Sequence, residues 1–394
     1  MSVFRPRVLG PLAAATFVGT WNITFLAPIL PEVADGIDVS VTAAGQLLTV
    51  SAVFTVLALI ALGPLSDRYG RKTMLTAGLT IMALASFGAA ATSNYPLLMA
   101  LRILAGVADA LVMPVAIAAV ADYFKEKDRQ VAINIMIIPG GAAAVIGLPL
   151  VVVVAALADW HVSFLMLGVT LGATALFAQT LPHVTRREHR APLREHYRAS
   201  YGEVLSSRTA LLVLLASVLS ASVWYGMITY AGAFFEDELD AGPTMLSLLF
   251  AGLGVAYIIG GGFGALFARR ASPRSIAITS TVMAAVLLVP AITSAPVTPI
   301  SVALAFAFAA SRGPAIAALA NMMLELAPGA SGTAISTYAV VAALGLLIGA
   351  ASGGVAIAAL GFTGMAVAFT VLAVGSTAVL MSPTRAAAGA EARA

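Results

Sequence analysis

Long apolar runs separated by short polar segments are the dominant pattern of this sequence. A helix of roughly 20 apolar residues crosses the hydrocarbon layer of a bilayer, and runs of that length recur along the whole chain. They predict twelve transmembrane helices, at residues 8–30, 42–65, 73–92, 96–121, 130–157, 162–181, 209–234, 244–267, 275–294, 299–326, 332–359 and 363–381. We therefore predict an all-α membrane protein.

Composition supports this prediction. Hydrophobic residues make up 60% of the 394 positions and charged residues 10%, with a mean hydropathy of +1.00. A water-soluble globule of this length cannot bury so much apolar surface.

The first run is longer than the apolar core of a cleavable signal peptide, contains Pro28 and is followed directly by Pro31. The sequence has no cysteine, which excludes disulfides and thiolate metal sites.

Charge predicts the orientation of the helices. All Lys and Arg except Arg102 and Arg312, nineteen of the 21, fall on one side of the twelve-helix arrangement. By the positive-inside rule that side is cytoplasmic, with both termini, and we expect a prokaryotic inner membrane. The basic pI of about 9.3 then reflects topology and does not indicate nucleic-acid binding. The opposite loops carry only acids: Glu32, Asp35, Asp38, Asp159, Glu236, Asp237, Glu238 and Asp240.

The longest predicted cytoplasmic segment divides the chain into two related halves. A shift of 203 residues sets "VMPVAIAAVADYF" over "GPAIAALANMMLEL" and Asp122 against Glu325, although Ala-rich helices also resemble one another in general. Two halves with an internal repeat are typical of secondary transporters. The predicted parts are a six-helix half at 1–181, a linker at 182–208, a second six-helix half at 209–381 and a tail at 382–394.

The linker is expected to be amphipathic and at least partly helical. Its arginines Arg194, Arg198 and Arg208 would lie at the headgroup level of the membrane and favour anionic lipid. We expect a solvated surface role for the histidines His161, His183, His189 and His196, whose scattering argues against a metal site.

The segment "GPLSDRYGRK" (63–72) places four charges between two predicted helices. It resembles the signature loop of the major facilitator superfamily, Gly-x-x-x-Asp-Arg-x-Gly-Arg-Lys. The segment also lies between the second and third predicted helices, where that superfamily has this loop. The resemblance covers the whole chain and implies twelve helices in two pseudo-symmetric halves. The matching residues are Gly63, Asp67, Arg68, Gly70, Arg71 and Lys72.

The resemblance implies a cytoplasmic latch. Asp67 would lie near the start of the eleventh helix, and Arg71 would bridge to the acid that ends the fourth, here Asp122; Glu325 would belong to the same gate. Gly63 and Gly70 suit close helix approach and a tight turn. The alternative is that Arg68 and its basic neighbours only fix topology, but topology requires neither the acid nor the glycines.

Weaker matches point toward the drug and solute:proton antiporter branch. "LRILAG" (101–106) resembles the superfamily's helix 4 motif, and "GLPL" (147–150) resembles its helix 5 region. Here the sequence departs from the antiporter pattern, because Leu148 stands before Pro149 and valines follow. The likeness to the superfamily is therefore closer than the likeness to this branch.

Three charges lie well inside the predicted spans, away from their ends: Arg102, Asp109 and Arg312. Each ionisable group at membrane depth costs roughly 2.5–3.5 kcal/mol, so such groups are functional candidates. Arg102 and Asp109 are seven residues apart and share a helix face. Asp109 is either a protonation or cation site or an arginine's structural partner. Arg102 has either a coupling or a packing role, and Arg312 binds either Asp109 or an anionic group.

Polar and aromatic side chains supply candidates for the substrate cavity, which the resemblance places among helices 1, 4, 7 and 10. Each of the aromatic candidates has packing or interface anchoring as its alternative. The candidates are Trp21, Asn22, Trp224, Tyr225, Tyr230 and Asn321.

We predict a secondary transporter that works by alternating access and is not an enzyme. No Gly-x-x-x-x-Gly-Lys-Ser/Thr segment is present, so ATP is not the direct driving force. The favoured function is proton-coupled efflux of small amphipathic or drug-like molecules, without a cofactor. The alternatives are an exporter of sugars, amino acids or other polar metabolites, and a lipid flippase. The expected partners are substrate and membrane lipids, with a monomer as the functional unit.

Overall fold

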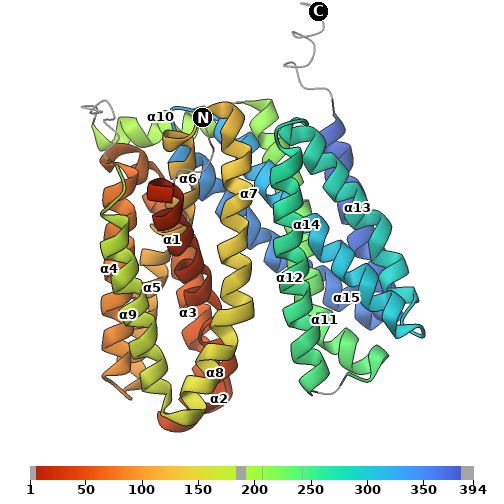
Figure 1. The fold of residues 1–394 in the computed structure, drawn as a ribbon, viewed down its shortest axis with the longest axis horizontal. Helices are drawn as coiled ribbons and strands as arrows, with labels where there is room; N and C mark the ends of the chain where they lie inside the picture. The colour runs from red at the N-terminus through yellow and green to blue at the C-terminus, as the bar shows by residue number, and fades with distance from the viewer. Residues whose placement is uncertain (1–5, 183–191, 206, 242, 383–394) are drawn as a thin grey trace, which may run out of the picture. The chain divides into compact units, whose positions relative to one another are not determined.

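The computed structural model describes residues 6–182, 192–205, 207–241 and 243–382, and all regular structure in these ranges is helical (Figure 1). The prediction of an all-α fold is therefore confirmed. The first half contains α1 (Pro6–Thr24), η1 (Ala27–Ile29), α2 (Leu30–Gly36), α3 (Val41–Tyr69), α4 (Arg71–Ala90), α5 (Tyr95–Asp109), α6 (Met113–Tyr123), α7 (Glu126–Ala142), the π-helix η2 (Ala143–Gly147), α8 (Leu148–Leu157) and α9 (Trp160–Ala178). It is followed by α10 (Leu193–Leu205), α11 (Arg208–Leu239), α12 (Pro243–Phe267), α13 (Pro273–Thr293), α14 (Thr298–Leu326) and α15 (Ser331–Met381).

Eleven helical stretches of the described residues are long and apolar enough to cross a membrane. The last of them, α15, contains non-helical backbone at Leu360 and at Gly361, whose φ of 64° suits a residue without a side chain. This break divides α15 into two parts, so the twelve predicted runs are all present as helix. Two boundaries differ from the prediction in a way that affects charged residues. The helix α3 continues to Tyr69, through Asp67 and Arg68, and α11 continues to Leu239, through the acids at 236–238; the hydropathy pattern placed both sets in loops.

The chain folds into two compact units. The first contains Met1–Tyr201 together with Gly329–Ala339, and the second contains Gly202–Pro328 and Val340–Ala394. The start of α15 therefore belongs to the first unit and its remainder to the second. Each unit is described by itself below.

In the first unit, α4 packs along α9 and α5, and α3 packs along α5 (Figure 1). The helices α3 and α5 approach closely at Gly106, where a Cβ atom would lie 2.3 Å from the carbonyl oxygen of Ser51. Thr55, one turn further along α3, donates to the carbonyl oxygens of Gly106 and Ser51, each at 2.9 Å. The small residue thus lets the backbones of α3 and α5 pack directly on each other.

In the second unit, α14 packs between α12 and α13, and aromatic and aliphatic side chains from all five helices α11 to α15 form the core. A small cavity of about 20 Å³ lies beside Trp224 and Phe308. It has room for about one water molecule and is far smaller than a site for a drug-like molecule. We therefore treat it as a packing defect of the core.

Part of the predicted linker is helical, as α10 shows. His196, Ser200 and Val204 form its buried face, whereas Arg194 and Arg198 are exposed. The remaining linker residues at 183–191, including His183 and His189, and the tail at 383–394 lie outside the described residues.

The contact between α3 and α5 yields a stability prediction. Gly106→Ala should lower the midpoint of thermal unfolding in detergent, because the added methyl group overpacks the interface at a cost of about 1–3 kcal/mol. Gly172→Ala, on α9, is the matched control, since a Cβ atom there meets nothing within 4 Å. Its midpoint should stay unchanged or rise slightly. An equal response of the two variants would contradict the close contact.

Candidate functional site

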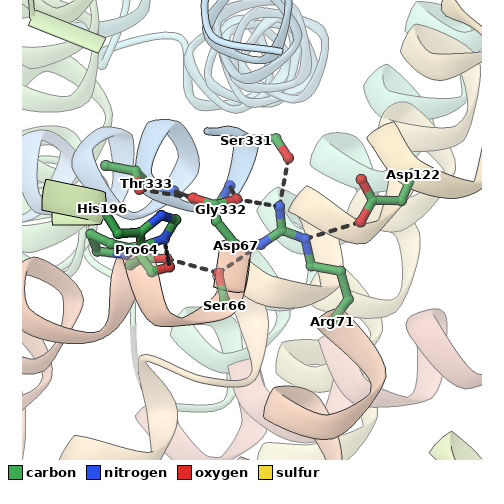
Figure 2. Close-up of polar contacts among 10 residues, drawn as sticks. Pro64, Ser66, Asp67, Arg71, Asp122, His196, Ser331, Gly332 and Thr333 are labelled. Atoms are coloured by element: carbon green, nitrogen blue, oxygen red, sulfur yellow. Dashed lines mark hydrogen bonds and ion pairs between the residues drawn. The ribbon is translucent and has the colours of Figure 1, made fainter. Parts of the chain in front are cut away.

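The Asp67 carboxylate lies at the first turn of α15 (Figure 2). Its Oδ1 accepts a hydrogen bond from the backbone N–H of Gly332 at 2.8 Å, and its Oδ2 accepts from the N–H of Thr333 at 2.9 Å and from that residue's hydroxyl at 2.8 Å. The first N–H groups of a helix have no partner within the helix, and the helix dipole favours a negative charge beside them. Asp67 therefore caps α15 from a helix that lies 265 residues earlier in the chain.

Glycines bring the carboxylate to the helix end. A Cβ atom on Gly332 would lie 2.0 Å from the hydroxyl oxygen of Ser66, and a Cβ atom on Gly63 would lie 2.9 Å from the Cβ atom of Ser336. A side chain at either position would require these neighbouring atoms to move. Gly63 thus provides the close approach that the sequence suggested, although to a partner far along the chain.

Arg71 connects the carboxylate to further acceptors. Its Nη2 donates to Asp67 Oδ1 and to the Ser331 hydroxyl, both at 2.6 Å, and its Nη1 donates to the Ser66 hydroxyl at 2.6 Å. Its Nε donates to Asp122 Oδ2, at the end of α6, at 3.2 Å. Gly70 has a φ of 89°, which lets the chain turn sharply between α3 and α4 and return Arg71 to Asp67.

We call this group the Asp67 cluster: Ser66, Asp67, Arg71, Asp122, Ser331, Gly332 and Thr333. Asp67 and Arg71 are each 3% exposed. Burial of ions is unfavourable unless they are paired and hydrogen-bonded. Here the two charges pair with each other, Asp67 accepts further hydrogen bonds from α15, and Arg71 donates further ones to its neighbours. The arrangement connects the start of α15 to α3 and α6.

Other residues of the predicted gate and signature make further contacts. The Arg68 guanidinium lies 5.8 Å from the ring centre of Tyr69. Lys72 donates to the carbonyl oxygen of Leu181 at 2.9 Å. Glu325 belongs to the second unit, where it accepts a hydrogen bond from the Asn321 amide at 2.7 Å.

The sequence analysis missed Ser66, Ser331 and Thr333. Ser66 lies inside the quoted signature but at one of its variable positions. Ser331 and Thr333 belong to "SGT" at the start of a helix, a position at which small polar residues commonly satisfy free N–H groups. That local signal could have indicated the helix start, but not its partner on α3.

The intramembrane charges of the first unit lie on α5. Arg102 is 3% and Asp109 5% exposed, and they form no ion pair with each other within 4.0 Å. Among the described residues, no hydrogen-bond partner is found for Asp109 Oδ1 or Arg102 Nε. Asp109 is thus a buried carboxylate whose charge is less well compensated than that of Asp67.

Asp109 also ends α5. The predicted helix at 96–121 is a single span but not a single helix, since turns at 110–112 separate α5 from α6. The physical reason is Pro114, which has no N–H to donate and whose ring hinders the preceding turn. Thr55 donates to the carbonyl oxygen of Gly106, which in a continuous helix would accept from the N–H of Ala110. The carboxylate therefore lies at a break in the helix.

Arg312 lies in the second unit, on α14, and is 1% exposed. Its Nη2 donates to the carbonyl oxygen of Ser220 at 3.0 Å and also contacts the Ser220 hydroxyl. Ser220 was not among the predicted residues. Nearby on α11, Trp224 stacks on Tyr257 with ring centres 5.4 Å apart and an interplanar angle of 19°. Tyr225 follows it in sequence and is half-buried.

The remaining cavity candidates are mostly packed. Trp21 is buried between Phe17 and Phe25, with ring centres at 5.7 and 6.4 Å. Its indole N–H and the neighbouring Asn22 Oδ1 have no hydrogen-bond partner among the described residues. The Tyr230 hydroxyl donates to the carbonyl oxygen of Ala350 at 2.6 Å, which favours a packing role.

Two histidines can be compared with the expected surface role. His196 was wrongly assigned to it: the residue is 5% exposed, and its Nε2 donates to the carbonyl oxygen of Pro64 at 2.9 Å. His161 is half-exposed, stacks on Trp160 and contacts the Asp159 carboxylate at 2.5 Å. Hydrogen bonds from the backbone N–H and the ring of His161 hold the pKa of Asp159 below its usual value.

The Asp67 cluster yields a second prediction. Gly332→Ala should open it, because the methyl group would occupy the space of the Ser66 hydroxyl and of Arg71 Nη1. The sequence has no cysteine, so Ala334→Cys, buried at the start of α15, provides a single thiol reporter. Its alkylation rate should rise about tenfold or more, since each hydrogen bond to a charged group contributes about 1.5–3 kcal/mol. In Gly262→Ala, where a Cβ atom meets nothing within 4 Å, the rate should stay low. Equal rates in the two variants would contradict the prediction.

Comparison with known proteins identifies the family. The uncharacterized MFS-type transporter YdgK of Bacillus subtilis (strain 168) is 27% identical over 303 residues, which cover 71% of this chain and 71% of YdgK. The methylenomycin A resistance protein of the same organism is 29% identical over 177 residues, 43% of this chain and 37% of that protein. The crystal structure of the transporter FucP in the outward conformation matches with a TM-score of 0.80 at 14% identity over 98% of this chain and all of that one, a likeness of fold alone. The family model described as Major Facilitator Superfamily matches residues 12–240, more than half of the sequence. The protein belongs to the Major Facilitator Superfamily.

Proposed function

We propose that this transporter couples export of small amphipathic molecules to proton entry, with Asp109 as the proton-carrying group. The observation that carries the proposal is the buried Asp109 carboxylate at the break between α5 and α6, with one oxygen lacking a partner among the described residues. The similarity to a methylenomycin A resistance protein supports an export function over uptake.

Proton exchange follows from the chemistry of a buried carboxylate. An uncompensated charge in a dry site is costly, whereas the neutral acid is tolerated there. When water or substrate reaches the break at 110–112, the charged form becomes accessible and the proton can leave. Arg102, seven residues earlier on the same helix, would compensate the charge after the proton has left.

The Asp67 cluster would then act as the latch of the alternating-access cycle. Its contacts hold the first turn of α15 in the first unit, whereas α15 from Val340 onward belongs to the second. Release of Asp67 would free this helix from α3 and α6. The positive-inside rule favours a cytoplasmic position for the cluster because basic residues surround it, so the intact latch would correspond to a closed cytoplasmic side.

Proteoliposomes test the coupling. A panel of amphipathic compounds is screened for proton movement with a pH-sensitive dye inside the vesicles, and active compounds serve as substrates. Asp109→Asn should abolish substrate-driven proton flux and uphill transport but preserve downhill exchange of substrate, because the amide keeps the shape and cannot carry the proton. Asp237→Asn, which changes an exposed acid at the end of α11, should behave as the unmodified protein.

Uphill transport by Asp109→Asn with an unchanged dependence on pH would refute the assignment. Loss of both uphill and downhill transport in a folded Asp109→Asn protein would likewise refute it, since the group would then be needed for movement itself.

A further inference from the structure

The linker helix α10 contacts α3 around Pro64. Proline has no N–H, so the carbonyl oxygen four residues earlier, that of Ile60, loses its helical donor. The proline ring also pushes the neighbouring carbonyl groups outward, which typically bends a helix. Pro64 lies inside α3, three residues before Asp67. Any bend at Pro64 therefore changes the position of the Asp67 carboxylate.

Side chains of α10 replace the missing donor. The Tyr201 hydroxyl donates to the carbonyl oxygen of Ile60 at 2.5 Å, and the Tyr197 hydroxyl donates to that of Ala61. His196 Nε2 donates to the carbonyl oxygen of Pro64 itself at 2.9 Å (Figure 2). Within the first unit, α10 thus satisfies three carbonyl groups on the two sides of the proline.

The three donors suit this role by their spacing and chemistry. Tyr197 and Tyr201 are four residues apart, so they project from the same face of α10 one turn apart, beside the buried His196. Burial raises the pKa of both phenols above its usual value, which keeps the hydroxyl groups protonated and able to donate. The opposite face of α10 carries the exposed Arg194 and Arg198.

We propose that α10 is a positioning element of the Asp67 latch: Tyr197 and Tyr201, with His196, hold the segment of α3 around Pro64 in place and so keep Asp67 at the first turn of α15. This proposal rests on the proposed latch and adds the linker to it. It assigns the helix between the two halves a role in the gate besides connecting them. Movement of α10 would release α3 and thereby weaken the latch.

A simple packing role for the tyrosines makes a different prediction. If they only fill space, the loss of a hydroxyl should have the same small effect whatever residue stands at position 64. If Tyr201 satisfies the carbonyl group that Pro64 leaves without a donor, then Pro64→Ala, which restores the N–H, should make that hydroxyl dispensable.

The experiment combines these substitutions with the Ala334→Cys reporter. Latch opening is measured as the alkylation rate of the single thiol in vesicles without substrate or a proton gradient. Loss of one neutral hydrogen bond shifts such an equilibrium by about two- to tenfold. We expect Tyr201→Phe to raise the rate by this factor with Pro64 present and by less than about twofold in Pro64→Ala. Tyr197→Phe should also raise the rate.

Tyr95→Phe is the matched control. Its hydroxyl also donates to a carbonyl oxygen of α3, that of Ala43 at 2.8 Å, but near the other end of the helix and far from the proline in sequence. It should leave the rate unchanged. The same effect of Tyr201→Phe in both backgrounds, or none with Pro64 present, would overturn the proposal. Because the thiol reports latch opening alone, this result is distinct from a failure of proton coupling at Asp109.

Discussion

The cap that Asp67 places on the first turn of α15 is the interaction on which the proposed mechanism depends. A helix start inside a protein leaves N–H groups that need acceptors, and the acceptor for Gly332 and Thr333 comes from a distant part of the chain. The Asp67 carboxylate on α3 supplies this acceptor. The small residues Gly63 and Gly332 leave room for it, and the turn at Gly70 returns Arg71 to it. Arg71 then donates four hydrogen bonds to Asp67 and its neighbours. The residues of the signature segment thus act together to cap the start of α15, a helix far along the chain.

The two buried carboxylates of the first unit differ in a way that suggests different roles. Asp67 accepts four hydrogen bonds, one of them from Arg71, so its charged form is fully compensated. Asp109 lies at a helix break and has an oxygen without a partner in the described part of the chain. A compensated carboxylate holds elements together, whereas a poorly compensated one favours proton exchange.

Much of this account could be predicted from the sequence, because spans and the signature loop are local signals. Each apolar run found by hydropathy is helical in the structure, and the short segment 63–72 identified Asp67 and Arg71. Hydropathy could not show that the helix at 96–121 is interrupted beside Asp109, since a break in backbone hydrogen bonding leaves the apolar pattern unchanged. The role of Ser331 also depends on a contact with a residue 260 positions away. His196 was misjudged because its basic neighbours suggested a solvated segment, whereas its partner is the carbonyl group of a proline.

Hydrogen exchange at the start of α15 tests the central claim most directly. The backbone amides of Gly332 and Thr333 are held by Asp67, so in the unmodified protein a peptide covering residues 329–339 should exchange slowly. In Asp67→Ala the same peptide should exchange at least about tenfold faster, because two amides lose a charged acceptor. Peptides from α12 and α13, in the second unit, should exchange at the same rate in both proteins. Equally slow exchange of residues 329–339 in both proteins would contradict the claim that this carboxylate holds the helix start.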